Sequence, residues 1–304
     1  MAFLYALPGA VAEGLIWGLM AIGVYISYKI LDIADLTVDG SICTGACVCA
    51  VLLAQGMPVP VCVALAFVAG ALAGMVSGLL HTVLGIPSIL AGILTQLMLY
   101  SVNLMILSGK SLMPIDPRAN DLLVHMSDNP HAICSMAMIV TMTIIGLWLF
   151  FYTEIGLTIK STGDNPNMSR AQGVNVKFNQ VLGLALANGI VALAGALLAQ
   201  YKGSANINDG RGAIVIGLAA IFIGLSVSLK IKPNFVCSLI GCIGGGIVYY
   251  IVYNFVILLG LKTDYLKMLS AIIVAVFLAV PYLKQEYFTK KKSLHPKEGG
   301  STHA

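Results

Sequence analysis

The chain has 304 residues, of which 59% are hydrophobic and only 10% are charged, and its formal net charge is +4. Soluble domains carry roughly 25% charged residues, and the shortage here extends over the whole chain, which excludes a soluble body with one membrane anchor. The small, dispersed positive charge also excludes a nucleic-acid-binding surface. The composition therefore predicts an integral membrane protein that crosses the bilayer many times.

Apolar stretches of membrane-spanning length follow one another along the chain. A spanning helix needs about 20 mostly apolar residues, and charges, prolines and glycines divide the sequence into nine such stretches. We expect them at residues 8–28, at two positions within 42–80, and at 86–108, 132–152, 178–201, 212–229, 233–259 and 267–283. The prediction is an all-α, polytopic transmembrane bundle of about nine spans, within a range of eight to ten.

The lysines and arginines predict the orientation of this bundle. With nine spans and a cytoplasmic C-terminus, eleven Lys and Arg residues fall on the cytoplasmic side and six on the other side. Cytoplasmic segments carry the excess of positive charge, so we expect the N-terminus outside and the C-terminus inside. Residues 1–285 are expected to form a single transmembrane domain. Residues 286–304 are expected to form a basic, disordered cytoplasmic tail that can contact anionic lipid.

Glycines at four-residue spacing recur within two of the predicted spans. Gly14 and Gly18 share one face of the first span, and Gly70, Gly74 and Gly78 share one face of the third. Helix association in lipid relies on small residues that let two backbones approach closely. The pattern therefore predicts a compact bundle.

A polar segment at residues 153–177, between the fifth and sixth spans, has the sequence of a short capped helix. Asp164 or Asn165 can cap a helix that begins at Pro166, and Gly173 suits the position after its end. A helix of two turns, 166–172, has no stability of its own in water. Two interpretations stay open at this point: a helix that docks into a partner, and a capped surface loop.

Two polar breaks interrupt the apolar sequence before helices of small residues. The first contains Asp32, Asp35 and Asp39, and the second covers residues 206–212. In the predicted topology they enter the membrane from opposite sides, which is typical of transporters with inverted repeats and discontinuous helices. We expect Asp39 to lie deepest, where an unpaired acid is costly. The alternative is that these acids cap helices at the membrane interface.

These breaks and their surroundings supply the candidates for a translocation pathway or gate. The candidate residues are Asp39, Gly40, Ser41, Pro87, Asn188 and Asp209.

Catalytic and metal-binding patterns are missing from the sequence. The five histidines are scattered, and Cys43 and Cys47 are expected to pack rather than to bind a soft metal. A Gly-Lys-Ser sequence at 109–111 lacks the first glycine of a phosphate-binding loop. We therefore expect no catalytic residue, metal or cofactor in this chain, and any ATP hydrolysis would take place in another protein.

Three stretches resemble the permeases of ABC importers, specifically those of the branched-chain amino acid and ribose type. They are residues 33–46, 162–174 and 210–219. The resemblance extends over residues 10–285, and within the family the chain is similar to the group of tryptophan/tyrosine uptake permeases. It implies that residues 166–172 form the coupling helix, which docks into a cytoplasmic ATPase. The implied coupling residues are Gly163, Asp164, Asn165, Pro166, Arg170 and Gly173.

The resemblance also implies the partners and the setting. A second permease copy, expected as a homodimer, would join two copies of the ATPase, which bind ATP and magnesium. An extracytoplasmic binding protein, such as a lipoprotein, would deliver an aromatic amino acid at the bacterial cytoplasmic membrane. Three alternatives remain: a transporter driven by an ion gradient, an importer of a branched-chain amino acid, sugar or vitamin, and a membrane scaffold that transports nothing.

Overall fold

The computed structural model describes residues 2–116, 122–124, 129–231 and 234–258, together with 268, 271–272 and 274–275. Most of the predicted ninth span and all of the predicted tail lie outside the described residues. The described helices are α1 (Ala2–Tyr25), the π-helix η1 that continues it (Ile26–Ile30), α2 (Val38–Ala54), α3 (Val59–Thr82), α4 (Ser88–Ile106), α5 (Asn129–Phe151), α6 (Glu154–Asp164), α7 (Pro166–Ala171), α8 (Val176–Lys202), α9 (Ala213–Ile231) and α10 (Phe235–Leu258).

The long helices coincide with the first eight predicted spans. Among the described residues, six helices are long and apolar enough to cross a membrane, and two shorter apolar helices lie at Val38–Ala54 and Ala213–Ser226. The 17 residues of α2 rise only about 25 Å at 1.5 Å per residue, less than the ~30 Å hydrocarbon core. The chain is therefore a polytopic helical membrane protein in which α2 is short for a span.

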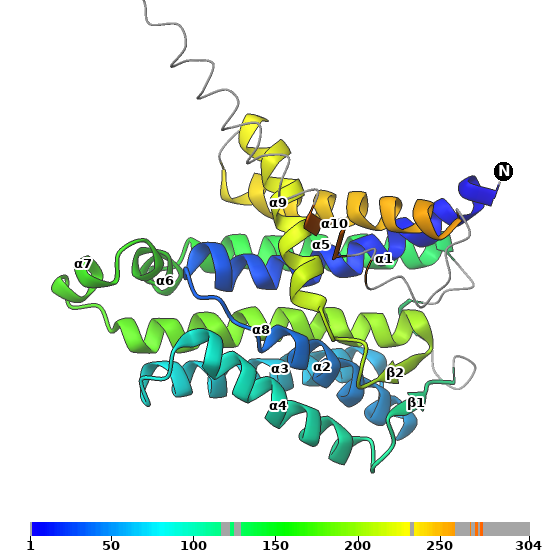
Figure 1. Cartoon of the computed structure of the whole chain (residues 1–304), viewed down its shortest axis with the longest axis horizontal. Helices are drawn as coiled ribbons and strands as arrows, with labels where there is room; N and C mark the ends of the chain where they lie inside the picture. The colour runs from blue at the N-terminus through cyan, green and yellow to red at the C-terminus, as the bar shows by residue number, and fades with distance from the viewer. Residues whose placement is uncertain are drawn as a thin grey trace, which may run out of the picture.

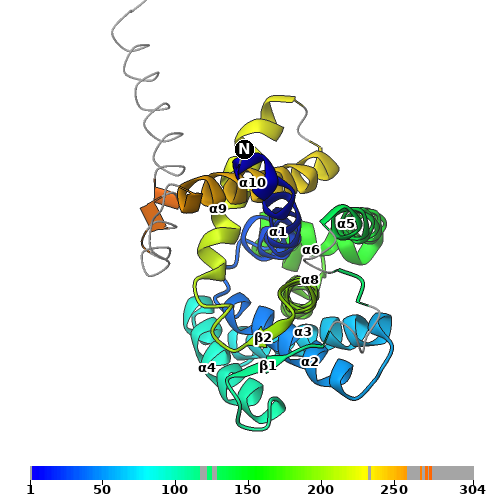
Figure 2. The same ribbon diagram turned by 90° about the vertical axis from the view of Figure 1, so that its right-hand side faces the viewer.

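Helix α8 forms the centre of the bundle. Figure 2 shows it between α1 on one side and α2 and α3 on the other. A Cβ added to Gly74 would overlap the carbonyl oxygen of Leu184 in α8, and one added to Gly70 would overlap the side chain of Ala192. Gly14 and Gly18 in α1 approach α10 in the same way. The glycine spacing thus correctly predicted close helix packing.

Two short strands accompany the helices of this mostly α-helical chain. β1 (Leu112–Pro114) and β2 (Ser204–Asn206) pair antiparallel, with Leu112 opposite Asn206. They lie at the end of the long helices opposite α6 and α7 (Figure 1). Three residues are too few to show the alternation of polar and apolar side chains that identifies a strand in a sequence. The pairing of these strands depends instead on where the adjoining helices end.

Candidate functional site

Helices α6 and α7 form a compact unit at one end of the bundle (Figure 1). Thr153 caps α6, since its Oγ1 accepts a hydrogen bond from the N–H of Gly156 at 3.3 Å. Asn165, rather than Asp164, caps α7 by accepting from the N–H of Met168 at 3.0 Å. Gly173 follows α7 with a φ of +83°, a value that favours glycine.

Three contacts fix the α6–α7 unit to its neighbours and to itself. The hydroxyl of Ser169 in α7 donates to the carbonyl of Ser161 in α6 at 2.8 Å. In turn, Thr162 accepts a hydrogen bond from the side-chain amide of Asn179 in α8 at 3.2 Å. Gly163 lies so close to η1 that an added Cβ would overlap the carbonyl oxygen of Ile30. The unit is therefore held against both η1 and α8.

Most of the surface of α7 is exposed. Of its six residues only Ser169 is buried, whereas Met168 is 60% exposed and Arg170 is also exposed. A cavity of about 220 Å³ lies beside the unit, between η1, α6 and the start of α10, and Lys29, Lys160 and Asp164 are among its lining residues. The α6–α7 unit is thus bonded to the bundle on its inner side and exposed on its outer side.

The two polar breaks contact each other. Asp39 lies in the first turn of α2, and its carboxylate accepts hydrogen bonds from the N–H groups of Gly212 at 2.9 Å and Ile214 at 2.8 Å. These donors are at the start of α9, where the first N–H groups of a helix have no partner within it. Asp39 thus caps a helix, as one interpretation held, but the helix is α9 and not its own.

Asp35 is buried more completely inside the bundle than Asp39, the acid that we expect to lie deepest in the membrane. Asp35 is 3% exposed, whereas Asp39 is only partly buried. The chain between η1 and α2 turns inward, and Asp35 accepts a hydrogen bond from the side-chain amide of Asn188 at 2.7 Å. Its other oxygen accepts from the N–H of Thr37 at 2.9 Å and the hydroxyl of Ser77 at 3.3 Å.

Asn188 links this acid to α2. Its side-chain oxygen accepts a hydrogen bond from the hydroxyl of Ser41 at 2.7 Å, and Asn188 is fully buried. It is the thirteenth of the 27 residues of α8, so the polar network lies near the middle of a spanning helix. Buried polar networks of this kind stabilise one arrangement of the helices when every member has a partner.

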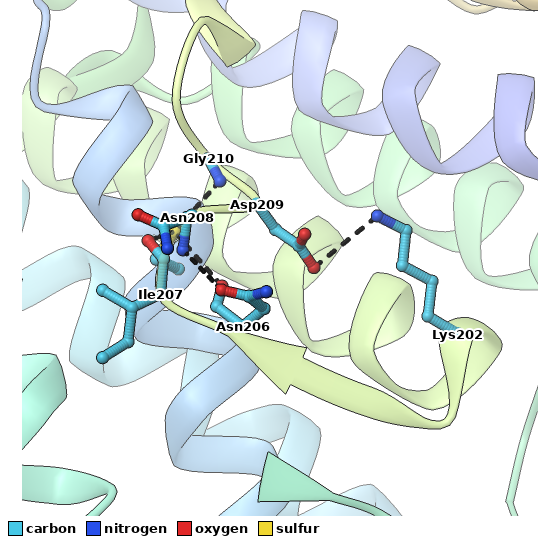
Figure 3. A network of polar contacts seen from close by, with 7 residues as sticks. Lys202, Asn206, Ile207, Asn208, Asp209 and Gly210 are labelled. Atoms are coloured by element: carbon cyan, nitrogen blue, oxygen red, sulfur yellow. Dashed lines mark hydrogen bonds and ion pairs between the residues drawn. The ribbon is translucent and has the colours of Figure 1, made fainter. Parts of the chain in front are cut away.

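The turn before α9 is organised by a separate set of polar contacts (Figure 3). The N–H of Asn208 donates to the side-chain oxygen of Asn206 at 2.9 Å, and the N–H of Gly210 donates to the sulfur of Cys43 at 3.1 Å. Asp209 forms an ion pair with Lys202 at 3.6 Å. This turn is therefore held both to α2 and to the end of α8.

The structure separates the predicted pathway residues into groups. Ser41 and Asn188 join the network around Asp35, while Asp39 and Gly40 line a cavity of about 330 Å³. Asp209 is paired at the β2 end, and Pro87 is exposed in the turn before α4. The predicted set is thus only partly brought together.

Sequence reasoning missed four polar residues of this cavity. They are Gln96, Tyr100, Asn103 and Arg211. The spacing of Gln96, Tyr100 and Asn103 at i, i+4 and i+7 places them on one face of α4, and this polar stripe in an apolar helix was the available signal. Within the described ranges, no three His, Cys, Asp or Glu side chains come together to hold a metal ion.

Comparison with known proteins places these features in a family. The family model described as branched-chain amino acid transport system, permease component, matches residues 9–280. A tyrosine transport system permease protein of Clostridioides difficile is 36% identical over 285 residues, which cover 94% of each chain. An uncharacterized protein of Rickettsia prowazekii is 31% identical over 281 residues, 91% of this chain and 97% of the relative.

A more distant similarity points to another import system. An autoinducer 2 import system permease protein of Salmonella typhimurium is 27% identical over 191 residues, 62% of this chain and 54% of the relative. No solved structure matches the chain.

Proposed function

The chain belongs to the family of branched-chain amino acid transport system permeases, and from this premise we propose that it forms the translocation pathway of an importer for an aromatic amino acid such as tyrosine. The family supplies the permease component of ABC transporters. The solute is proposed from the Clostridioides difficile relative, whose name specifies tyrosine transport and which matches this chain over 94% of its length. The fold adds a buried polar network on α8, its central helix, as expected for a transport protein with polar groups inside its spans.

The exposed α7 carries the proposal for energy coupling. We assign it as the coupling helix that docks into the ATPase, with Gly163, Asp164, Asn165, Pro166, Arg170 and Gly173 in or beside the docking surface. Its exposed Met168 and Arg170 are suited to a partner surface. A hydrogen bond attaches α7 to α6, and another attaches α6 to α8, so a force on α7 can reach the spans through α6.

The contacts suggest a route for that force. Movement of α6 would push on η1 through the close approach of Gly163 and Ile30. The chain after η1 leads directly to Asp35, which is bonded to α8, and to Asp39, which is bonded to α9. In this proposal ATP binding by the partner shifts η1, and the start of α9 follows.

The proposed assembly combines the ATPase and binding-protein partners that the family implies with a copy number that we propose. Two permease copies, as a homodimer, would combine with two ATPase subunits and an extracytoplasmic binding protein in the bacterial cytoplasmic membrane. ATP and magnesium would bind to the ATPase subunits. We retain nine spans with the N-terminus outside, which places α7 in the cytoplasm and β1–β2 on the receiving side.

Photo-crosslinking tests the coupling assignment. A photo-reactive amino acid in place of Met168, in a transporter co-expressed with its ATPase, should crosslink to the ATPase subunit. The same amino acid in place of Met142, which is 74% exposed on α5, is the matched control and should not. Crosslinking from position 142 and not from 168 would place the ATPase elsewhere and overturn the assignment.

A transporter driven by an ion gradient is the alternative that Asp35 favours, because a buried acid in a span is a typical ion or proton site. It predicts that tyrosine uptake stops when an ionophore collapses the gradient while cellular ATP is maintained. The ABC importer predicts continued uptake under those conditions and loss of uptake when ATP is depleted.

A further inference from the structure

The cavity between α2, α4 and the turn before α9 has the composition of a ligand site. Its volume is about 330 Å³, at the lower end of the range of about 300–1,000 Å³ for small-molecule sites. Figure 2 shows α4 and α9 on the same side of the bundle, and α2 contacts both helices. The cavity therefore lies where the two polar breaks of the sequence meet.

Asn103 supplies the observation that points to a ligand. Its side chain is 1% exposed and lines the cavity, and neither its amide nitrogen nor its amide oxygen has a hydrogen-bond partner among the described residues. Buried polar groups in folded proteins are nearly always paired, and an unpaired one is costly. A side chain with a free donor and a free acceptor facing a cavity is suited to a polar molecule bound there.

The charges of the cavity restrict the kind of molecule. Asp39 and Arg211 both line it, and within the part of the chain that the structure describes they form no ion pair with each other. Asp39 is held in place by its bonds to the start of α9, and a carboxylate has lone pairs left for a further donor. A simple anion would be repelled by the negative charge of Asp39, and a simple cation would be repelled by the positive charge of Arg211. A zwitterion can satisfy both.

An aromatic side chain completes the site. The guanidinium carbon of Arg211 lies 5.8 Å from the ring centre of Tyr100, and Tyr100 and Gln96 line the same cavity. A stacked guanidinium is preorganised to bind a carboxylate through two N–H groups. The Tyr100 ring also offers an apolar face to a flat side chain.

We infer that this cavity binds the zwitterionic head group of an α-amino acid inside the permease, in addition to any site on a binding protein. Arg211 and the amide nitrogen of Asn103 bind the carboxylate, and Asp39 and the amide oxygen of Asn103 bind the ammonium group. The inference rests on the proposed function for the identity of the solute. Because Asp39 also caps α9, an occupied cavity would be joined directly to the start of that helix.

Direct binding to the purified permease–ATPase complex, without the binding protein, tests the inference. The probe is radiolabelled L-tyrosine. Two competitors separate the charges: tyramine, which lacks the carboxylate, and 3-(4-hydroxyphenyl)propionate, which lacks the ammonium group. We expect both to compete at least tenfold more weakly than unlabelled tyrosine, since each leaves one charged group of the cavity unpaired.

Matched variants locate the binding. Arg211→Gln and Asn103→Leu should each weaken tyrosine binding about tenfold or more, the effect expected for the loss of a charged or buried hydrogen bond. Lys202→Gln is the control for Arg211→Gln, because it removes one positive charge from the nearby ion pair with Asp209. Asn254→Leu is the control for Asn103→Leu, because it replaces an asparagine in α10 whose amide donates to the carbonyl of Tyr250. Both controls should bind tyrosine within about twofold of the wild-type complex.

Uptake by the complete transporter is measured in parallel and separates the two proposals. If the wild-type transporter imports tyrosine but the complex binds none, or if all four variants bind it equally, the inference is overturned while the proposed function stands. If the complete transporter imports no amino acid, the proposed solute fails, and the zwitterion site fails with it. If Arg211→Gln weakens both the import and the binding of tyrosine, and Lys202→Gln weakens neither, the proposed function and the proposed site are both supported.

Discussion

The carboxylate of Asp39 accepts a hydrogen bond from the backbone N–H of Ile214 at 2.8 Å, although the two residues are 175 positions apart in the chain. Asp39 lies in the first turn of α2 and Ile214 in the first turn of α9, so the Asp39 side chain joins the starts of two helices. A carboxylate at a helix N-terminus is stabilised by the unpaired N–H groups and by the helix dipole. The contact therefore holds α2 and α9 in a fixed relation at the place where the cavity lies.

Substitution of Asp39 should loosen the start of α9. Asp39→Asn retains one acceptor oxygen but removes the charge, so we expect a loss of about 1 kcal/mol in stability. The measurement is the midpoint of thermal unfolding in detergent. Asp32→Asn makes the same change at an exposed side chain and should leave the midpoint unchanged. Equal effects of the two substitutions would show that the cap on α9 contributes nothing.

An exchange of Asp35 and Asn188 tests the buried network. Asn188→Asp alone places two carboxylates in contact, at a site where the present donor and acceptor are 2.7 Å apart. We expect a loss on the order of 3 kcal/mol or more, seen as little monodisperse protein after extraction. The double substitution Asp35→Asn with Asn188→Asp restores one amide and one carboxylate and should recover most of the yield. A double variant no better than the single one would argue against the pairing.

The close approach of Gly163 to η1 is required for coupling in the proposed mechanism. Gly163→Ala would force α6 away from the carbonyl of Ile30, and overpacking of this kind costs about 1–3 kcal/mol. We expect normal membrane insertion with at least a several-fold loss of ATP-driven uptake. Gly146→Ala is the control, because a Cβ at Gly146 meets nothing within 4 Å. Full uptake by Gly163→Ala would mean that α6 and η1 do not move together.

The cap on α7 gives a second test of coupling. Asn165→Ala removes the acceptor for the N–H of Met168 and should cost about 1 kcal/mol, a large effect for a helix of six residues. We expect reduced stimulation of the partner ATPase when the binding protein and solute are added. Asn165→Asp retains an acceptor at the same position and should restore stimulation, whereas a defect of equal size would point to a direct contact of Asn165 with the partner.

Local patterns in the sequence predicted much of the fold. The apolar stretches located the six long helices and the two shorter apolar ones among the described residues, because length and hydropathy depend only on consecutive residues. The spacing of Gly70 and Gly74 correctly indicated a packed helix face. The cap and end of α7 were also predicted, since Asn165, Pro166 and Gly173 act on their own backbone. The ninth span and the orientation stay predictions.

Other features needed more than local pattern. Helix α6 was missed because its apolar residues are interspersed with polar ones and were interpreted as loop, although Thr153 at its start was a usable capping signal. The burial of Asp35 was not predicted, because Asp35 and Asp39 lie in one polar stretch and differ only in how the chain turns between η1 and α2. The polar stripe of Gln96, Tyr100 and Asn103 on α4 is visible in the sequence, but the sequence does not show that it faces Asp39 and Arg211 across a cavity.

The sequence by itself determined that this chain spans a membrane, where its long apolar stretches lie, and to which family its motifs are similar. Those properties depend on transfer of local segments into lipid and on capping within a few residues. Only the tertiary structure decided that Asp35 pairs with Asn188, that Asp39 caps α9, and that Arg211 and Asn103 face one cavity. Such partners are fixed by which helices pack together, and a hydrogen bond between distant residues leaves no local pattern in a single sequence.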